Sequence, residues 1–200
     1  MSLVVVGGHS RNVGKTSVVA GLISALPEFK WTAMKITQYG HSICSSDGEP
    51  CHCATDDHTW AISEENDRAG LTDTSRFIVA GASRVWWVRS QQGHLAEALP
   101  NLRKILTSSG NAILESNSIV KFLRPDLYLT VLDPETADFK QSAQEFLDRA
   151  DAVIMHEGKS SNWQGVSLKP VAGQPVFSIR PPKYVTTEIA DFVRSRLNAG

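Results

Sequence analysis

Residues 3 to 17 read Leu-Val-Val-Val-Gly-Gly-His-Ser-Arg-Asn-Val-Gly-Lys-Thr-Ser, and this stretch decides the fold. A β-branched run from Val4 to Val6 breaks at Gly7 and Gly8, passes through a polar loop, and reaches Gly14-Lys15-Thr16 at the start of a helical pattern. Strand, glycine-containing loop and helix in this order are typical of a phosphate-binding loop, in which backbone N–H groups point at the phosphates.

The residue types in the loop suit a triphosphate. Gly14 lets the backbone approach closely, the ammonium of Lys15 suits β- and γ-phosphate oxygens, and the hydroxyl of Thr16 suits Mg²⁺. The consensus has a glycine five positions before Gly14, where this chain has His9, and the nearest glycine stands one place earlier. A chance Gly-Lys-Thr on a surface helix would not explain the flanking strand and helix. The predicted nucleotide-binding residues of the loop are Gly8, Asn12, Val13, Gly14, Lys15, Thr16 and Ser17.

The composition fits one well-buried domain. The chain has 200 residues, 42% of them hydrophobic, and we expect a single domain over residues 1–200 with an inserted loop over 37–72. The net charge of −1 and the lack of a Lys/Arg cluster predict neither a nucleic-acid partner nor binding to an anionic membrane. The first apolar run meets glycine at once, which predicts no signal peptide or membrane span and therefore a cytoplasmic protein.

Short apolar runs alternate with helical patterns along the rest of the chain. Strands are expected at 31–36, 84–88, 111–115, 127–132, 152–155 and 176–179. Helices are expected at 18–26, 73–80, 95–106, 137–150 and 187–197, with Pro100 either kinking the third or starting a further helix. This alternation predicts right-handed βαβ units and an α/β fold, a doubly wound and mostly parallel sheet of the P-loop NTPase type.

Residues 37 to 72 form a long polar stretch with one short helical candidate at 60–65. Loops of this length in compact domains are usually functional. The cysteines of the chain all lie here, at Cys44, Cys51 and Cys53. Together with His41 or His58 they could supply the tetrahedral donors that zinc requires. The C-x6-C-x-C spacing is not that of a zinc ribbon, so an iron–sulfur cluster, redox thiols and ordinary free cysteines remain alternatives. The odd cysteine number argues against a disulfide framework.

Three charged residues are predicted to lie beside the phosphate loop. Glu115 ends an apolar run, where phosphate-loop proteins place the carboxylate that contacts Mg²⁺ directly or through water. Lys35 ends the second predicted strand and could bind phosphates or an acidic substrate. Asp73 could bind Mg²⁺ or substrate, or it could cap a helix. For Glu115 and Lys35 the plainer alternative is a solvated charge at a strand end. We predict catalytic roles for Lys15, Lys35 and Glu115, and a Mg²⁺ site at Thr16 and Glu115.

The base of the nucleotide is not determined by any motif. No Asn-Lys-x-Asp follows a predicted strand, so the usual guanine-reading motif is missing, and residues 178–182 after the last strand could border the base. No general base stands out, since His9 lies in the loop but could equally be a spacer.

Several motifs together resemble the MobB family of P-loop proteins, which assists molybdopterin guanine dinucleotide biosynthesis. The likeness lies in residues 13–17, in Lys35-Ile36-Thr37, in the stretch from Asp73-Thr74-Ser75-Arg76 to Ala80-Gly81-Ala82, and in Leu114-Glu115. The stretch that begins at Asp73 is the most specific, because generic phosphate-loop proteins have no reason to carry it. The resemblance implies a nucleotide site at 14–17 with Lys35, Asp73 and Glu115 beside it, GTP as the nucleotide, and a homodimer.

The loop also has the G-x5-G-K-T form of dethiobiotin synthetase, an ATP-dependent carboxylate-activating ligase of related fold, and Met34-Lys35 and Glu115 fit that enzyme too. The cysteine-bearing loop belongs to neither pattern. Three functions therefore stay open. They are a MobB-like nucleoside triphosphatase or accessory protein that uses Mg²⁺ with GTP or ATP, an ATP-dependent ligase or kinase acting on a small carboxylate, and a nucleotide-gated metal-binding protein. The acceptor, a small molecule or a cofactor, is not identified by the sequence.

Overall fold

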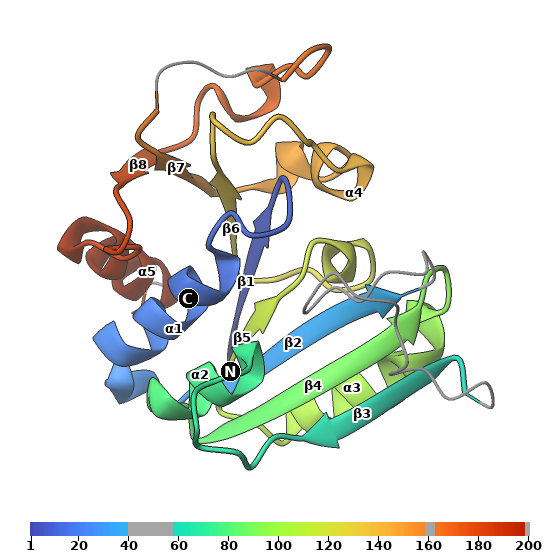
Figure 1. Ribbon diagram of the computed structural model, residues 1–200. Coiled ribbons are helices and arrows are strands. Elements are labelled where there is room, and N and C mark those ends of the chain that lie inside the picture. Colours follow the sequence, from blue (N-terminus) through green and yellow to red (C-terminus); the bar gives the residue numbers. More distant parts are fainter. Residues whose placement is uncertain (40–57, 159–162, 199–200) are drawn as a thin grey trace.

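A mixed sheet of eight strands forms the centre of the computed structural model, which describes residues 1–39, 58–158 and 163–198 (Figure 1). The strand order is β3-β4-β2-β5-β1-β6-β7-β8. The pairs are parallel except for β3 with β4, which is antiparallel. The strands are β1 (Ser2–Gly8), β2 (Thr32–Tyr39), β3 (Trp60–Glu64), β4 (Arg84–Gln91), β5 (Asn111–Glu115), β6 (Leu127–Leu132), β7 (Ala152–His156) and β8 (Val176–Ile179). The predicted α/β fold with a mostly parallel sheet is confirmed.

Helices cover both faces of this sheet, as a doubly wound fold requires (Figure 1). The α-helices are α1 (Lys15–Ala25), α2 (Asp73–Val79), α3 (Leu95–Thr107), α4 (Gln141–Gln144) and α5 (Thr187–Asn198). Short 3₁₀ turns lie at η1 (Pro27–Phe29), η2 (Ser118–Lys121), η3 (Leu147–Arg149) and η4 (Lys169–Val171). Buried side chains of α1, α2 and α5 form one core cluster, and those of α3 and η3 form a second cluster on the opposite face.

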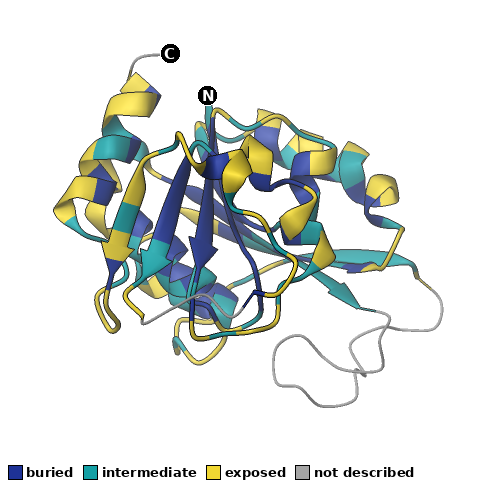
Figure 2. Ribbon diagram, turned by 90° about the horizontal axis from the view of Figure 1, so that it is seen from above, coloured by how far each residue is buried: buried dark blue, intermediate teal, exposed yellow. Residues whose placement is uncertain are grey.

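The side chains of strand β1 show why the sheet needs a layer of helices on each face. Val4 and Val6 belong to the core cluster under α1, whereas Leu3 and Val5 belong to the cluster under α3. All four side chains are buried, and Figure 2 shows the central strands as the most buried part of the molecule. A central parallel strand is covered on both faces, so it reads as a continuous apolar run instead of an alternating one.

The sheet register brings three predicted site segments to one edge. Strand β1 is flanked by β5 and β6, and the sheet continues to β2, β4 and β3 on one side and to β7 and β8 on the other. Lys35 in β2 stands directly opposite Glu115, the last residue of β5, and Glu115 stands opposite Val6 of β1. The phosphate loop that follows β1 therefore begins beside Lys35 and Glu115.

Two predictions in the first half of the chain were wrong in extent or type. The second strand continues to Tyr39, so Lys35 lies inside β2 and not at its tip. The helical candidate at 60–65 is instead strand β3, an antiparallel strand that pairs with β4. Its large apolar residues Trp60 and Ile62 alternate with the small residues Ala61 and Ser63, which is the two-residue period of a strand, and they pack against the α3-side cluster.

Two predictions in the second half also change. The helix expected at 137–150 is reduced to α4 and η3, because the residues before α4 bind the phosphate loop instead of forming a helix. Pro100 lies within a single helix, α3, and does not start a further one. Across the described residues, every helix is too short or too polar to cross a membrane.

Candidate phosphate-binding site

The loop between β1 and α1 is shaped by two residues in the left-handed backbone region. Gly14 has a φ of 88° and Asn12 a φ of 58°, which glycine adopts freely and asparagine tolerates better than most residues. A Cβ on Gly14 would also lie 2.3 Å from Cε1 of Tyr184. Helix α1 begins at the next residue, Lys15, without a side-chain cap from any described residue. Its first N–H groups are therefore free to bind an anion.

The departure from the consensus at His9 has a structural explanation. Gly8 is the last residue of β1, and the side-chain amide of Asn117 pairs with both its N–H and its carbonyl at 2.8 Å. A Cβ on Gly7 would lie 2.4 Å from Oδ1 of Asn117, so glycine is needed at position 7 for this close approach. His9 does not adopt a positive φ, and its buried ring packs against two aromatic rings. A glycine at position 9 is therefore not required.

His9 ties the loop to the segment between β6 and α4. Its Nδ1 donates to the carbonyl of Asp138 at 2.8 Å, and its Nε2 accepts the N–H of Asp133 at 3.0 Å. The N–H of Lys140 donates to the His9 carbonyl at 2.8 Å, and Oγ of Ser10 donates to Oδ2 of Asp138 at 2.6 Å. Acceptance at Nε2 requires a neutral ring, and burial lowers the pKa of His9 accordingly. Both ring nitrogens are engaged, so His9 is structural and not a general base.

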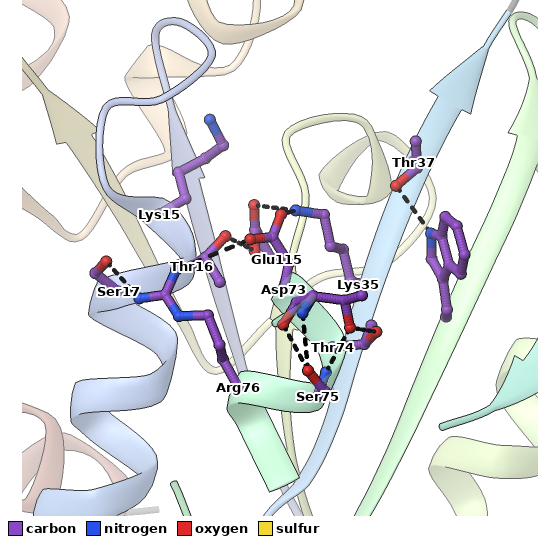
Figure 3. A network of polar contacts seen from close by, with 12 residues as sticks. Lys15, Thr16, Ser17, Lys35, Thr37, Asp73, Thr74, Ser75, Arg76 and Glu115 are labelled. Atoms are coloured by element: carbon purple, nitrogen blue, oxygen red, sulfur yellow. Dashed lines mark hydrogen bonds and ion pairs between the residues drawn. The ribbon is translucent and has the colours of Figure 1, made fainter. Parts of the chain in front are cut away.

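Lys15 lies along the loop with its ammonium turned back toward the backbone. Its Nζ donates to the Ser10 carbonyl, and Figure 3 shows its side chain pointing away from the carboxylates near α2. Burial lowers the pKa of Lys15 to about 8, although the Glu115 carboxylate acts in the opposite direction. A half-buried ammonium that contacts a neutral carbonyl gains stability when an anionic phosphate comes within reach.

A connected network of charged and polar groups lies next to the loop (Figure 3). Oγ1 of Thr16 donates to Oε2 of Glu115 at 2.8 Å, and Nζ of Lys35 lies 3.2 Å from Oε1 of the same carboxylate. Lys35 also pairs with Asp73, so one ammonium bridges two carboxylates. Burial alone would lower the pKa of Lys35, but the carboxylates of Glu115 and Asp73 outweigh it and raise the pKa. Lys35 is therefore a cation in this site at neutral pH.

Helix α2 brings Asp73 and Arg76 to the loop. Thr72 is its N-cap, because Thr72 Oγ1 accepts the N–H of Ser75 while Oγ of Ser75 accepts the N–H of Thr72. This capping box leaves the carboxylate of Asp73 free of the cap role and able to face Lys35. Arg76, one turn later, donates from Nη2 to Oγ of Ser17 at 3.0 Å.

Two cavities meet at the loop. The larger one, of about 980 Å³, is lined by Lys15, Thr16, Lys35, Asp73 and Glu115 together with residues of the segment before and within α4. The second, of about 770 Å³, lies between α1 and the start of α5. Ser17, Arg76 and Tyr184 line both cavities. A ligand with phosphates on the loop could therefore extend into either space.

Most of the site residues expected from the sequence lie together around the loop, but the predicted metal ligands do not belong to this group. Cys44, Cys51, Cys53 and His41 lie outside the described residues, so the metal prediction for them stays a prediction. His58 is described and exposed, and its carbonyl accepts a hydrogen bond from Oη of Tyr39 at 3.0 Å. Within the described parts of the chain, no three His, Cys, Asp or Glu side chains gather as a metal site.

Three residues that hold the loop or line its cavity were given no role by the sequence, although His156 and Asn117 follow predicted strands, where ligand-binding residues are expected. His156, at the end of β7, donates from Nε2 to the Val13 carbonyl at 3.0 Å, and Asn117 pairs with the end of β1. Lys140 reaches the same cavity from the segment before α4. His156 carried a weak signal, because it directly follows an apolar run at the carboxyl edge of the sheet.

No protein-family model matches the chain, and no curated protein matches it significantly. Similar solved structures include LpxK from Aquifex aeolicus in complex with ATP, HypB from Helicobacter pylori in complex with nickel, and MobB from Bacillus subtilis. Their sequence identities to this chain are 19%, 16% and 15%, and the TM-scores are 0.48, 0.48 and 0.42. The matches cover 89%, 99% and 98% of this chain, and 53%, 89% and 98% of those structures. This chain thus spans about half of LpxK. Likenesses at this level identify no activity.

Proposed function

We propose that this chain binds a nucleoside triphosphate with Mg²⁺ and hydrolyses it slowly, as a MobB-type accessory protein would. The observation that carries the proposal is the uncapped start of α1 behind Gly14, with Lys15 and Thr16 as its first residues. Unpaired N–H groups and the positive end of the helix macrodipole together favour a phosphate at this position.

The oxygen donors next to the loop fit Mg²⁺. The hydroxyl of Thr16 and the carboxylate of Glu115 are hard ligands, already 2.8 Å apart. Asp73 adds a second carboxylate, which pairs with the same Lys35 ammonium as Glu115 does. Thr16 and Glu115 would hold the ion, and Asp73 would support it. When bound, Mg²⁺ neutralises charge on the β- and γ-phosphates.

Lys15 and Lys35 supply the fixed positive charge of the proposed site. Phosphoryl transfer depends mainly on positioning and on stabilising charge that develops on the phosphate oxygens. Lys15 comes from the start of α1 and Lys35 from β2, so the two ammonium groups would approach the phosphates from different elements. The His9 ring cannot serve as the base, because both of its nitrogens are engaged, and we expect hydrolysis without a partner to be slow.

The nucleoside half of the ligand is proposed to lie in the second cavity. That cavity opens beyond Ser17, where the phosphate chain would leave the loop, and Pro182, Tyr184 and Val185 line it. An apolar and aromatic lining of this kind accommodates a flat base. Its residues border the stretch 178–182 that the sequence marked for the base.

Nucleotide titration by calorimetry tests the proposal. Wild-type protein should bind Mg·ATP or Mg·GTP, whereas Lys15→Ala should lose roughly 100-fold in affinity, because a charge-assisted contact to phosphate contributes about 3 kcal/mol. Lys104→Ala, an exposed lysine on α3, is the matched control and should bind as the wild type does. Retained affinity in a folded Lys15→Ala variant would contradict the proposal.

The identity of the preferred nucleotide separates the MobB-type proposal from its rival. A preference for GTP supports the MobB type. A preference for ATP, with hydrolysis accelerated by one small carboxylate, would support a ligase or kinase of the dethiobiotin synthetase kind.

A further inference from the structure

The larger cavity has a second group of cations at the end that faces α4. Arg11 of the loop and Lys140 line this end, together with the polar side chains of Gln141, Ser142 and Glu145. Lys35 reaches the cavity from β2, which lies on the other side of β1 from β6 in the strand order, and Asp73 reaches it from α2. The cavity therefore has two charged ends with the start of α1 between them.

Lys140 is held in place by its backbone. Its N–H donates to the His9 carbonyl at 2.8 Å, and its own carbonyl accepts the N–H of Ala143 at 2.9 Å. The side chain is half-buried, so it cannot leave the cavity without exposing its apolar stem. A lysine with an anchored backbone on a cavity wall is positioned for a ligand and not merely for solvent.

Arg11 and Lys140 are not in an ion pair with any residue that the structure describes. The nearby carboxylate of Asp138 already accepts the hydroxyl of Ser10 at 2.6 Å. Burial lowers the pKa of Lys140 and Arg11 lowers it further, while the carboxylates of Asp138 and Glu115 act in the opposite direction, so the two cations repel each other. An anion between them would remove that repulsion.

We propose that Arg11 and Lys140 bind an oxyanion group, a carboxylate or a phosphate, of a second small-molecule substrate, next to the terminal phosphate of the nucleotide. This inference rests on the proposed function, because it places the second substrate relative to a nucleotide on the loop. The nucleotide phosphates have their own donors in the α1 N–H groups, Lys15 and Thr16. Gln141 and Ser142 offer hydrogen bonds to the polar remainder of a metabolite.

Competitive acetylation of lysines followed by mass spectrometry tests the inference on the intact protein. The acetylation rate of Lys140 is read at pH 7.5 against that of the exposed Lys104, which serves as the internal reference. A saturating non-hydrolysable Mg·nucleotide should protect Lys15 and leave Lys140 reactive. Added inorganic phosphate or malonate should then slow acetylation of Lys140 by about tenfold when the anion is at about ten times its Kd. Phosphate and malonate are titrated separately to distinguish the two oxyanions.

Arg11→Met provides the second variant, since it removes one cation while leaving Lys140 as the reporter. Anion protection of Lys140 should be lost in Arg11→Met, while nucleotide protection of Lys15 is retained. The inference is overturned if the nucleotide alone protects Lys140 as fully as Lys15, or if neither anion slows its acetylation. Failure of the nucleotide to protect Lys15 would instead overturn the proposed function, so the two failures are distinguishable.

Discussion

Replacing Lys35 with methionine should destabilise the fold, because it leaves a buried carboxylate without its cation. The Glu115 side chain is 6% exposed and that of Lys35 14%, whereas Asp73 is 36% exposed and can be solvated by water. Removing one partner of a buried ion pair costs roughly 3–5 kcal/mol. Solvation of Asp73 and the remaining Thr16 bond to Glu115 reduce this, so we expect about 2–3 kcal/mol for Lys35→Met. For a chain of this length that is a fall in Tm of about 5–10 °C.

Urea unfolding without nucleotide or Mg²⁺ measures this effect, since a bound ligand would add its own stabilisation. The double variant Lys35→Met/Glu115→Gln should recover at least half of the loss, because the glutamine carbonyl still accepts from Thr16 and no buried charge remains. Lys104→Met on α3 is the control for loss of a lysine. A Lys35→Met protein as stable as the wild type, or a double variant no more stable than the single one, would refute the reasoning.

Three further predictions concern the loop and α2. The pKa of His9 is lowered in the folded state, so the free energy of unfolding should fall as the pH drops below about 6.5, by up to about 1.4 kcal/mol per pH unit. Urea unfolding at several pH values should show a flatter pH dependence for His9→Gln. Gly14→Ala should lower the free energy of unfolding by about 1–3 kcal/mol through the positive φ and abolish nucleotide binding. In urea unfolding and in nucleotide titration, Gly14→Ala/Tyr184→Ala should recover only the part of each loss that comes from the clash with the Tyr184 ring. Thr72→Ala should cost about 1 kcal/mol through the lost cap of α2, and Thr72→Ser should not, as thermal unfolding would show.

The strand, the loop and the start of α1 were predictable because their signals are local. Glycine placement, the apolar run and Gly14-Lys15-Thr16 act within a dozen residues of one another. Glu115 was predictable for a related reason, since it ends an apolar run at the edge where parallel strands present ligand-binding residues. Its pairing with Lys35 depends on register between β2 and β5, which the chain order does not specify.

The errors came from places where long-range contacts decide local structure. Residues 60–64 pair with β4 and so form a strand, although the sequence offered residues 60–65 as a short helical candidate in a polar stretch. The helix expected over 137–150 is interrupted because His9 and Ser10 bind Asp138 and Lys140 across the fold. Lys140 was given no role by the sequence for the same reason. Only the tertiary contact with the loop places it in the cavity.

Amide hydrogen exchange of residues 9–17, with and without saturating Mg·nucleotide, tests the central claim most directly. The account predicts that the N–H groups of Gly14 to Ser17 become strongly protected, while those of the exposed face of α3 do not change. Unchanged exchange across the loop, with nucleotide demonstrably bound elsewhere, would contradict the account.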